Sequence, residues 1–135
     1  MLSKQETLSA AYEDFQRMDY PAGATVVEEG EDGDAVFLIV RGKVEIRSGT
    51  RGNHPRTVAV LGKGEVFGEL AMFDGKHHMA SAITKEPTRV LALSRSEFHK
   101  RMATTDPVIR GVVMQMVKRF RQASRGPQQP LGQAV

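Results

Sequence analysis

Hydrophobic residues in the middle of this chain form short runs of strand type that alternate with turn residues. Such runs occupy residues 25–28, 35–40, 43–47, 56–61, 80–84 and 89–93, and glycine, asparagine or aspartate stands between most of them. β-Branched and aliphatic residues favour extended backbone, and glycine suits the tight turns that join antiparallel strands. Many short strands at near-regular spacing predict a closed or double-layered antiparallel β structure.

Helical patterns flank this β region. Ser3 and Glu6 have the spacing of a capping box, and four residues then recur at helical spacing: Leu8, Ala11, Tyr12 and Phe15. The pattern predicts a short N-terminal helix that ends at the Tyr-Pro-Ala-Gly sequence of residues 20–23, because proline cannot continue a helix and glycine opens a turn.

Two helices are predicted after the strands. Ser94 and Glu97 make a second capping box before a short helix that runs to about Met102. Asp106 then precedes Pro107, an N-cap followed by proline at the first helical position. An apolar stripe follows on one face: Val108, Ile109, Val112, Val113, Met116, Val117 and Phe120. We expect one domain over residues 1–125 and a disordered polar tail over residues 126–135.

Composition narrows the class of protein. The 135 residues suit a single domain, and the absence of cysteine excludes a disulfide scaffold, a thiolate metal site and a cysteine nucleophile. The first residues lack the basic head and apolar run of a secretory signal, and the apolar runs are too short to span a bilayer. We therefore expect a cytoplasmic protein without a membrane segment.

Charge is unevenly distributed around the net value of +3. Residues 1–34 carry two basic and nine acidic side chains, whereas residues 100–135 carry seven basic and one acidic. The basic excess lies on one helix-like stretch without interleaved aromatic residues, so it favours a solvated helix face or a partner contact over nucleic-acid binding.

Sequence motifs of catalysis and metal binding are missing. No Gly-x-Ser-x-Gly, Walker or His-Glu-x-x-His motif occurs, so the chain is not expected to be an enzyme. His77 and His78 are adjacent, and neighbours in an extended strand point to opposite faces, which disfavours a shared metal ion. The His-x-His pair of a cupin is absent, and the acidic residues 31–34 lack the alternating ligands of a calcium loop. We expect no metal and no tightly bound cofactor.

Residues 67–75, Phe-Gly-Glu-Leu-Ala-Met-Phe-Asp-Gly, interrupt the strands with a short helical pattern. The free N–H groups at the start of a helix favour an anion. Gly68 lets a ligand approach the backbone closely, and the Glu69 carboxylate accepts hydrogen bonds from a pair of vicinal hydroxyls such as those of ribose. The alternative is a hairpin turn that happens to carry a surface carboxylate.

Three motifs together carry a resemblance to a known family. They are Tyr-Pro-Ala-Gly at 20–23, Gly-Glu-Asp-Gly-Asp-Ala-Val-Phe-Leu-Ile-Val-Arg-Gly-Lys-Val at 30–44, and Gly-Lys-Gly-Glu-Val-Phe-Gly-Glu-Leu-Ala at 62–71. From Tyr20 to about Phe120 the chain resembles the cyclic-nucleotide-binding domains of catabolite-activator-type regulators, kinase regulatory subunits and nucleotide-gated channels, as a stand-alone bacterial member. The resemblance implies a mainly β fold: an eight-stranded antiparallel β-roll, double-stranded and jelly-roll-like, with a short N-terminal helix, a short cassette helix and C-terminal helices.

The same resemblance implies a binding site for cAMP or cGMP. Glu69 would hold the ribose 2′-hydroxyl, and the backbone amides around Gly68, Leu70 and Ala71 would face the cyclic phosphate. The long helix from Pro107 would be hinge and lid, with its 116–120 stretch closing over the purine. The expected ligand-binding residues are Phe67, Gly68, Glu69, Leu70, Ala71, His78, Met79 and Ala80, and the expected lid residues are Met116 and Phe120.

One short stretch departs from the family pattern. The family carries Pro-Arg and a small residue where this chain has His77, His78 and Met79, so His78 replaces the phosphate-binding arginine and Met79 a residue that is often a hydroxyl. Arginine offers a permanent charge and a bidentate fork, whereas neutral histidine offers at most one donor. Losing a buried charge-assisted pair costs roughly 2–5 kcal/mol, which corresponds to one to three orders of magnitude in affinity. Three outcomes follow: an empty site, a ligand with less or no charge, or weak cyclic-nucleotide binding helped by Lys76 and a protonated His78.

Two functions therefore compete on the sequence. One is a regulatory sensor module in which ligand capture moves the C-terminal helix. The other is a ligand-free or differently liganded module that binds an effector protein or a second copy through that helix. The residues beyond Arg125 are too few for a helix-turn-helix, so no direct DNA binding is expected.

Overall fold

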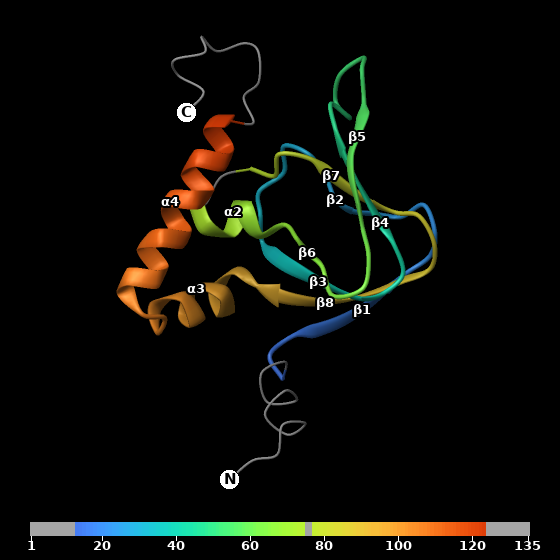
Figure 1. The fold of residues 1–135 in the computed structure, drawn as a ribbon. Helices are drawn as coiled ribbons and strands as arrows, with labels where there is room; N and C mark the ends of the chain where they lie inside the picture. Colours follow the sequence, from blue (N-terminus) through green and yellow to red (C-terminus); the bar gives the residue numbers. More distant parts are fainter. Residues whose placement is uncertain (1–12, 75–76, 124–135) are drawn as a thin grey trace.

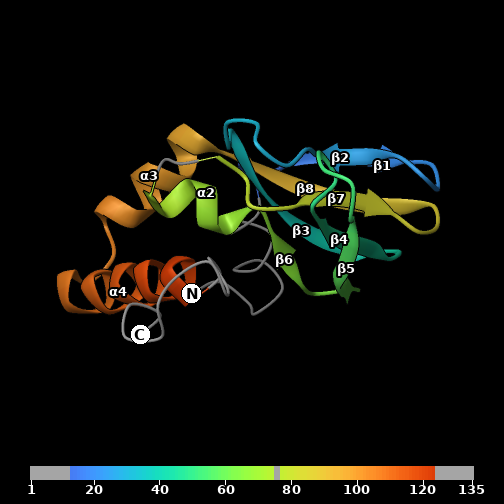
Figure 2. The ribbon, with the colours of Figure 1, turned by 90° about the horizontal axis from the view of Figure 1, so that it is seen from above.

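A computed structural model describes residues 13–74 and 77–123 of the chain. Eight strands form two four-stranded sheets in which every strand pair is antiparallel, in the orders β1-β8-β3-β6 and β2-β7-β4-β5. The three helices within these residues gather at one end of the β structure in both views (Figures 1 and 2). The elements are β1 Gln16–Tyr20, β2 Thr25–Val27, β3 Ala35–Arg41, β4 Val44–Ser48, β5 Arg56–Leu61, β6 Val66–Phe67, α2 Glu69–Asp74, β7 Ser81–Thr84, β8 Thr88–Ser94, α3 Arg95–Ala103 and α4 Pro107–Ala123.

The main hydrophobic core lies between the two sheets. The first sheet contributes Phe37, Ile39, Phe67, Val90 and Ala92, and the second contributes Val27, Val44 and Ala82. The rings of Phe37 and Phe67 stack with centroids 5.0 Å apart across the β3–β6 pair. This arrangement is the eight-stranded antiparallel β-roll with flanking helices that the sequence predicts.

A second cluster joins the helices to the first sheet. Val36 and Leu93 lie on paired positions of β3 and β8, and they pack with Ala71 and Met72 of α2. β3 is therefore buried on both faces, which explains why its apolar run is continuous instead of alternating. The helix α2 is held firmly at the position where β6 ends.

Both C-terminal helices begin where the sequence predicts. The Ser94 hydroxyl accepts a hydrogen bond from the Glu97 backbone N–H at the start of α3. The Asp106 carboxylate accepts hydrogen bonds from the N–H groups of Val108 and Ile109 at the start of α4. These side chains satisfy donors that a helix start otherwise leaves unpaired.

The prediction of a helix ending at residues 20–23 is wrong for its last part, because residues 16–20 form the strand β1. Five residues of β1 pair with β8, and Met18 and Tyr20 pack on the main core. Alternate residues of this segment face the core, as in a strand, and pairing with β8 stabilises the extended backbone. These two effects outweigh the helical spacing of the residues that precede it. The rest of the predicted N-terminal helix, from Ser3 to Tyr12, and the predicted tail at 126–135 lie outside the described residues.

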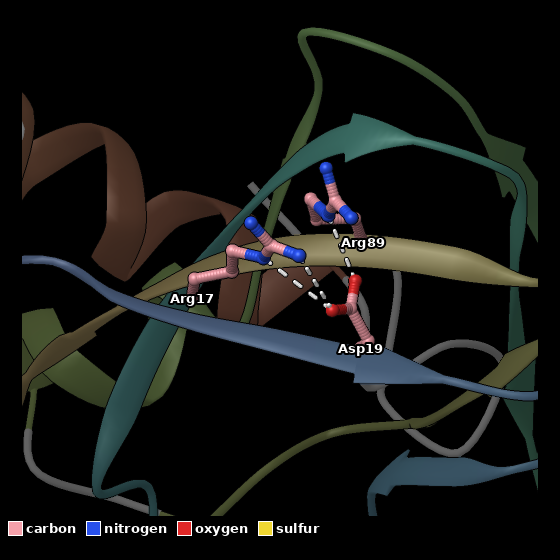
Figure 3. A network of polar contacts seen from close by, with 3 residues as sticks. All are labelled: Arg17, Asp19 and Arg89. Carbon is pink, nitrogen blue, oxygen red and sulfur yellow. Dashed lines mark hydrogen bonds and ion pairs between the residues drawn. The ribbon is translucent and has the colours of Figure 1, made fainter.

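A small ionic network fixes the register of β1 on β8. Asp19 Oδ1 lies 2.8 Å from Arg89 Nε of the facing strand, and Asp19 Oδ2 lies 3.3 Å from Arg17 Nη2 (Figure 3). The hydrogen bond from Arg89 is the main cause that holds the pKa of Asp19 below its usual value. The Arg17 and Asp19 side chains are more than half exposed and Arg89 is partly exposed, so the network specifies strand pairing more than it adds stability.

Candidate functional site

A cavity of about 480 Å³ opens between the β2-β7-β4-β5 sheet, the start of α2 and the end of α4. Its volume lies in the range of small-molecule sites. All eight residues expected to bind ligand line this cavity, and so does Phe120 of α4: the eight are Phe67, Gly68, Glu69, Leu70, Ala71, His78, Met79 and Ala80. The structure thus brings two sequence segments, 67–71 and 78–80, to one wall of the cavity.

Gly68 makes the sharp transition from β6 to α2. Its φ is +84°, and a Cβ at this position would lie 3.2 Å from the Ala35 carbonyl oxygen and 3.6 Å from the His78 Cε1 atom. Only glycine adopts this conformation without strain, and a Cβ here would press on the Ala35 carbonyl of β3. The residues of the first turn of α2 therefore line the cavity together with His78.

Glu69 is the first residue of α2 and is half-buried. Burial is the main cause that raises the pKa of its carboxyl above 4.5, and a hydrogen bond that the carboxylate accepts from the residue's own backbone N–H opposes the shift. A carboxylate that has lost part of its hydration gains from two hydroxyl donors more than an exposed carboxylate does. The side chain is suited to a neutral, hydroxyl-rich group.

His78 is buried, with 9% of its surface exposed. Two backbone hydrogen bonds hold it in place: its N–H donates to the Glu31 carbonyl at 2.9 Å, and its carbonyl accepts from the Gly30 N–H at 2.9 Å. Burial is the main cause that lowers the pKa of the imidazole below 6.5; Asp34 opposes this shift, and Arg121 and Arg95 add to it. The ring is therefore neutral at pH 7, which disfavours the protonated His78 considered from the sequence.

The two expected lid residues have different positions. Phe120 lines the cavity although 54% of its surface is exposed, so it forms part of the rim. Met116 is 64% exposed and is not among the lining residues. The rest of the predicted stripe is divided in the same way: Val117 is buried, Val113 is half-buried, and Val108, Ile109 and Val112 are exposed.

Sequence reasoning missed the part of the cavity that the strands supply. These residues come from β2, β4, β5, β6 and β7: Val27, Ile46, Ser48, Arg56, Val58, Ala59, Leu61, Val66 and Ala82. Ile46 and Ser48 stand two residues apart, a period that indicates a common face of β4. Among the residues that the structure describes, Arg56 is the one arginine that lines the cavity, at the start of β5.

His77, the neighbour of His78, contacts an acidic side chain at the surface and is not placed as a metal ligand. Its Nδ1 lies 2.8 Å from Asp32 Oδ1, and both side chains are exposed. Within residues 13–74 and 77–123, no three histidine, aspartate or glutamate side chains lie together as metal ligands. Over the same residues, no helix has the length and apolar character that a membrane crossing needs.

The described residues combine a two-sheet β-roll, a glycine-glutamate turn into a short helix, and a cavity of small-molecule size whose rim includes Phe120 of the C-terminal helix. The family model described as the cyclic nucleotide-binding domain matches residues 17–105. The chain belongs to this family.

Named relatives agree with that assignment. The chain is 34% identical over 118 residues to the cyclic AMP receptor protein of Thermus thermophilus, covering 87% of this chain and 55% of that protein. It is 34% identical over 92 residues to the cAMP-dependent protein kinase regulatory subunit of Aspergillus niger, covering 67% of this chain and 21% of that protein. The cAMP-bound structure of the EAL enzyme Bd1971 superposes with a TM-score of 0.76 at 28% identity, over 82% of this chain and 29% of that one. The chain therefore spans about half, or less, of the length of these relatives.

Proposed function

We propose that this chain is a regulatory sensor module that binds a cyclic nucleotide, cAMP or cGMP, in the cavity beside α2. The observation that carries the proposal is the convergence of residues 67–71, residues 78–80 and Phe120 on one cavity of nucleotide size. The named relatives include a cyclic AMP receptor and a cAMP-dependent kinase regulatory subunit, which supports this ligand class.

The chemistry of the cavity wall matches the parts of a cyclic nucleotide. The Glu69 carboxylate accepts hydrogen bonds from the ribose hydroxyl, and ligand binding replaces the hydration that burial removes from it. The backbone N–H groups from Gly68 to Ala71 face the cyclic phosphate at the start of α2. Aliphatic side chains of β4 and β5, such as Ile46 and Leu61, provide an apolar surface for the purine.

Neutral His78 sets the strength of binding. One imidazole N–H donates at most one uncharged hydrogen bond to a phosphate, where a guanidinium donates a charged pair. We expect weaker cyclic-nucleotide binding than an arginine at position 78 gives, by roughly one to three orders of magnitude. Weak binding still permits regulation when the ligand is abundant, because occupancy depends on concentration relative to Kd.

Signal output follows from the position of α4. Its residue Phe120 lies on the rim of the cavity, and α4 also packs against α2, which begins at the ligand-binding turn. A ligand that contacts Phe120 in one helix position and not in another shifts the helix toward the first position. Movement of α4 is the step that reports ligand binding to the rest of the protein or to a partner.

The exposed apolar side chains of α4 favour a second role in association. Val108, Ile109, Val112, Met116 and Phe120 are each more than half exposed on one helix. Their spacing of three and four residues matches the seam of paired helices. We infer that this stripe binds a second copy of the chain or an effector protein, either under control of the ligand or without any ligand.

Isothermal titration of the purified protein with cAMP and cGMP, beside a His78→Arg variant, tests the binding proposal. Measurable binding by the wild type that strengthens in His78→Arg indicates a working sensor with an unusual phosphate contact. Binding by the variant alone indicates an intact cavity that lacks only its charge. No binding by either protein rejects the cyclic nucleotide as ligand and leaves the association role of α4.

A further inference from the structure

Among the described residues, the lining of the cavity carries two charged side chains, and their charges are opposite. Glu69 begins α2 and Arg56 begins β5. His78 also lines the cavity, but burial keeps its imidazole neutral at pH 7. Within the described part of the chain, Arg56 is therefore the one permanent positive charge that the lining offers to a ligand.

The guanidinium of Arg56 is free to bind an anion. The residue is exposed, and within the part of the chain that the structure describes no hydrogen bond or ion pair engages its side chain. Arg47 of the neighbouring strand β4 differs, because its Nε lies 3.7 Å from Glu45 Oε1. An arginine without a partner gives up no existing contact when it binds an anion, so Arg56 is available in a way that Arg47 is not.

The register of the second sheet places Arg56 within reach of the segment 78–80. Arg56 pairs with Ser48 of β4, and Arg47, the residue before Ser48, pairs with Ser81 at the start of β7. Paired residues point to the same face of a sheet, and both Ser48 and Arg56 line the cavity. Neighbouring strands lie about 4.8 Å apart, so the start of β5 lies about 10 Å from the end of the segment 78–80. A long arginine side chain and a bound phosphate together span this distance.

We propose that Arg56 binds the anionic group of the ligand, which lies between its guanidinium and the segment 78–80. The inference rests on the function proposed above and names the residue that supplies a positive charge where position 78 has none. A guanidinium donates a bidentate pair of charged hydrogen bonds to a phosphate. Glu69 and Arg56 then divide the ligand between them, since the carboxylate accepts hydrogen bonds from hydroxyls and the guanidinium donates to the anion.

An anion held by Arg56 is bound at an exposed side chain instead of the buried position 78. Solvent and salt screen an exposed charge more than a buried one, so we expect Arg56 to recover only part of the affinity that His78 forgoes. The anion also connects two separate elements, the edge strand β5 and the segment 78–80. Ligand binding then holds the edge of the second sheet against that segment.

Titration of the wild type and Arg56→Gln with cAMP and with adenosine separates charge from shape, because adenosine has the purine and ribose without a phosphate. Amide chemical shifts detect weak binding of either ligand. We expect Arg56→Gln to raise the Kd of cAMP roughly 5- to 20-fold, an effect between those of an exposed ion pair and a charged hydrogen bond. The Kd of adenosine stays within about twofold of the wild type. Arg41→Gln, which removes an exposed arginine outside the cavity lining, is the matched control and leaves both affinities unchanged.

The outcomes distinguish this inference from the broader function. Equal cAMP affinity in the wild type and Arg56→Gln overturns the role of Arg56 and leaves the sensor function standing. Equal losses for cAMP and adenosine overturn it too, because they show that Arg56 contacts the purine or supports the structure. Binding of cAMP by His78→Arg but not by the wild type shows that Arg56 does not supply the missing charge. No binding by any of these proteins rejects the sensor function, and this inference with it.

Salt dependence provides a second test of the same contact. In the wild type the Kd of cAMP should rise with salt concentration more steeply than in Arg56→Gln, while the Kd of adenosine stays constant. Arg56→Lys, which keeps the charge and loses the fork, is expected to recover part of the lost affinity. The same salt dependence of cAMP binding in the wild type and Arg56→Gln contradicts the proposal.

Discussion

Replacing Gly68 by alanine tests the geometry on which the site depends. The substitution adds a Cβ at a φ of +84°, 3.2 Å from the Ala35 carbonyl oxygen and 3.4 Å from Phe37 Cδ2. A left-handed alanine costs about 1–2 kcal/mol, and the tight contacts with β3 add about 1 kcal/mol. We expect Gly68→Ala to lose about 2–3 kcal/mol of unfolding free energy, and the lost turn geometry to weaken ligand binding as well.

Gly64 provides a matched control for this experiment. Its φ is +87°, but a Cβ there would meet no heavy atom within 4 Å. Gly64→Ala therefore carries only the backbone cost of about 1–2 kcal/mol. Urea unfolding with an m value of about 1–3 kcal/mol/M places the midpoint of Gly68→Ala below that of Gly64→Ala. Equal midpoints for the two variants would refute the claim that residue 68 is packed tightly against β3.

Three further predictions concern single side chains. Burial raises the pKa of Glu69 above 4.5, so the folded protein holds that proton more tightly than the unfolded chain and loses stability as the carboxyl ionises. Glu69→Gln should therefore raise the urea unfolding midpoint at pH 7 but not at pH 4. Glu86→Gln, at an exposed position, is the control and should not show this pH-dependent gain. A higher midpoint of Glu69→Gln at pH 4 as well contradicts burial of the carboxylate as the cause. Burial lowers the pKa of His78, so the midpoint of its NMR titration should lie below pH 6.5. The unfolded chain then binds this proton more tightly than the folded protein, so the free energy of unfolding should fall as the pH drops below 6.5. His78→Gln should abolish this loss. An NMR titration midpoint of His78 above pH 6.5 contradicts this prediction. Met116→Glu should reduce self-association in analytical ultracentrifugation, whereas Val60→Glu, which alters an exposed residue of β5, should not; equal effects of the two variants rule out α4 as the interface.

Much of the fold could be predicted because local pattern and tertiary structure agree. The six strand-like runs correspond to strands, and the caps at Ser94 and Asp106 start helices where predicted. β1 was missed because its partner β8 lies about seventy residues further along the chain, and only that pairing explains why residues 16–20 are extended. β6 was missed because two residues carry too little pattern to indicate a strand.

The candidate site divides in a similar way. The contiguous segments 67–71 and 78–80 could be predicted from a glycine, a carboxylate and a family pattern, and both line the cavity. The contribution of Arg56 and the strand residues depends on how the β2-β7-β4-β5 sheet faces the segment 67–71 across the cavity, which no local signal specifies. The contact of Arg121 with the His77 carbonyl depends on the angle at which α4 returns to α2, and that angle appears only in three dimensions.

Titration of ¹⁵N-labelled protein with cAMP, followed by amide chemical shifts, tests the central claim most directly because it detects weak binding and locates it. The account predicts saturable shifts at residues 68–71 and at His78, with smaller ones along α4 near Phe120. The amides of Arg17 and Arg89, in the ionic network outside the cavity lining, should stay unchanged. Shifts spread over the exposed face of α4 with none at residues 68–71, or no shifts at millimolar cAMP, would contradict the account.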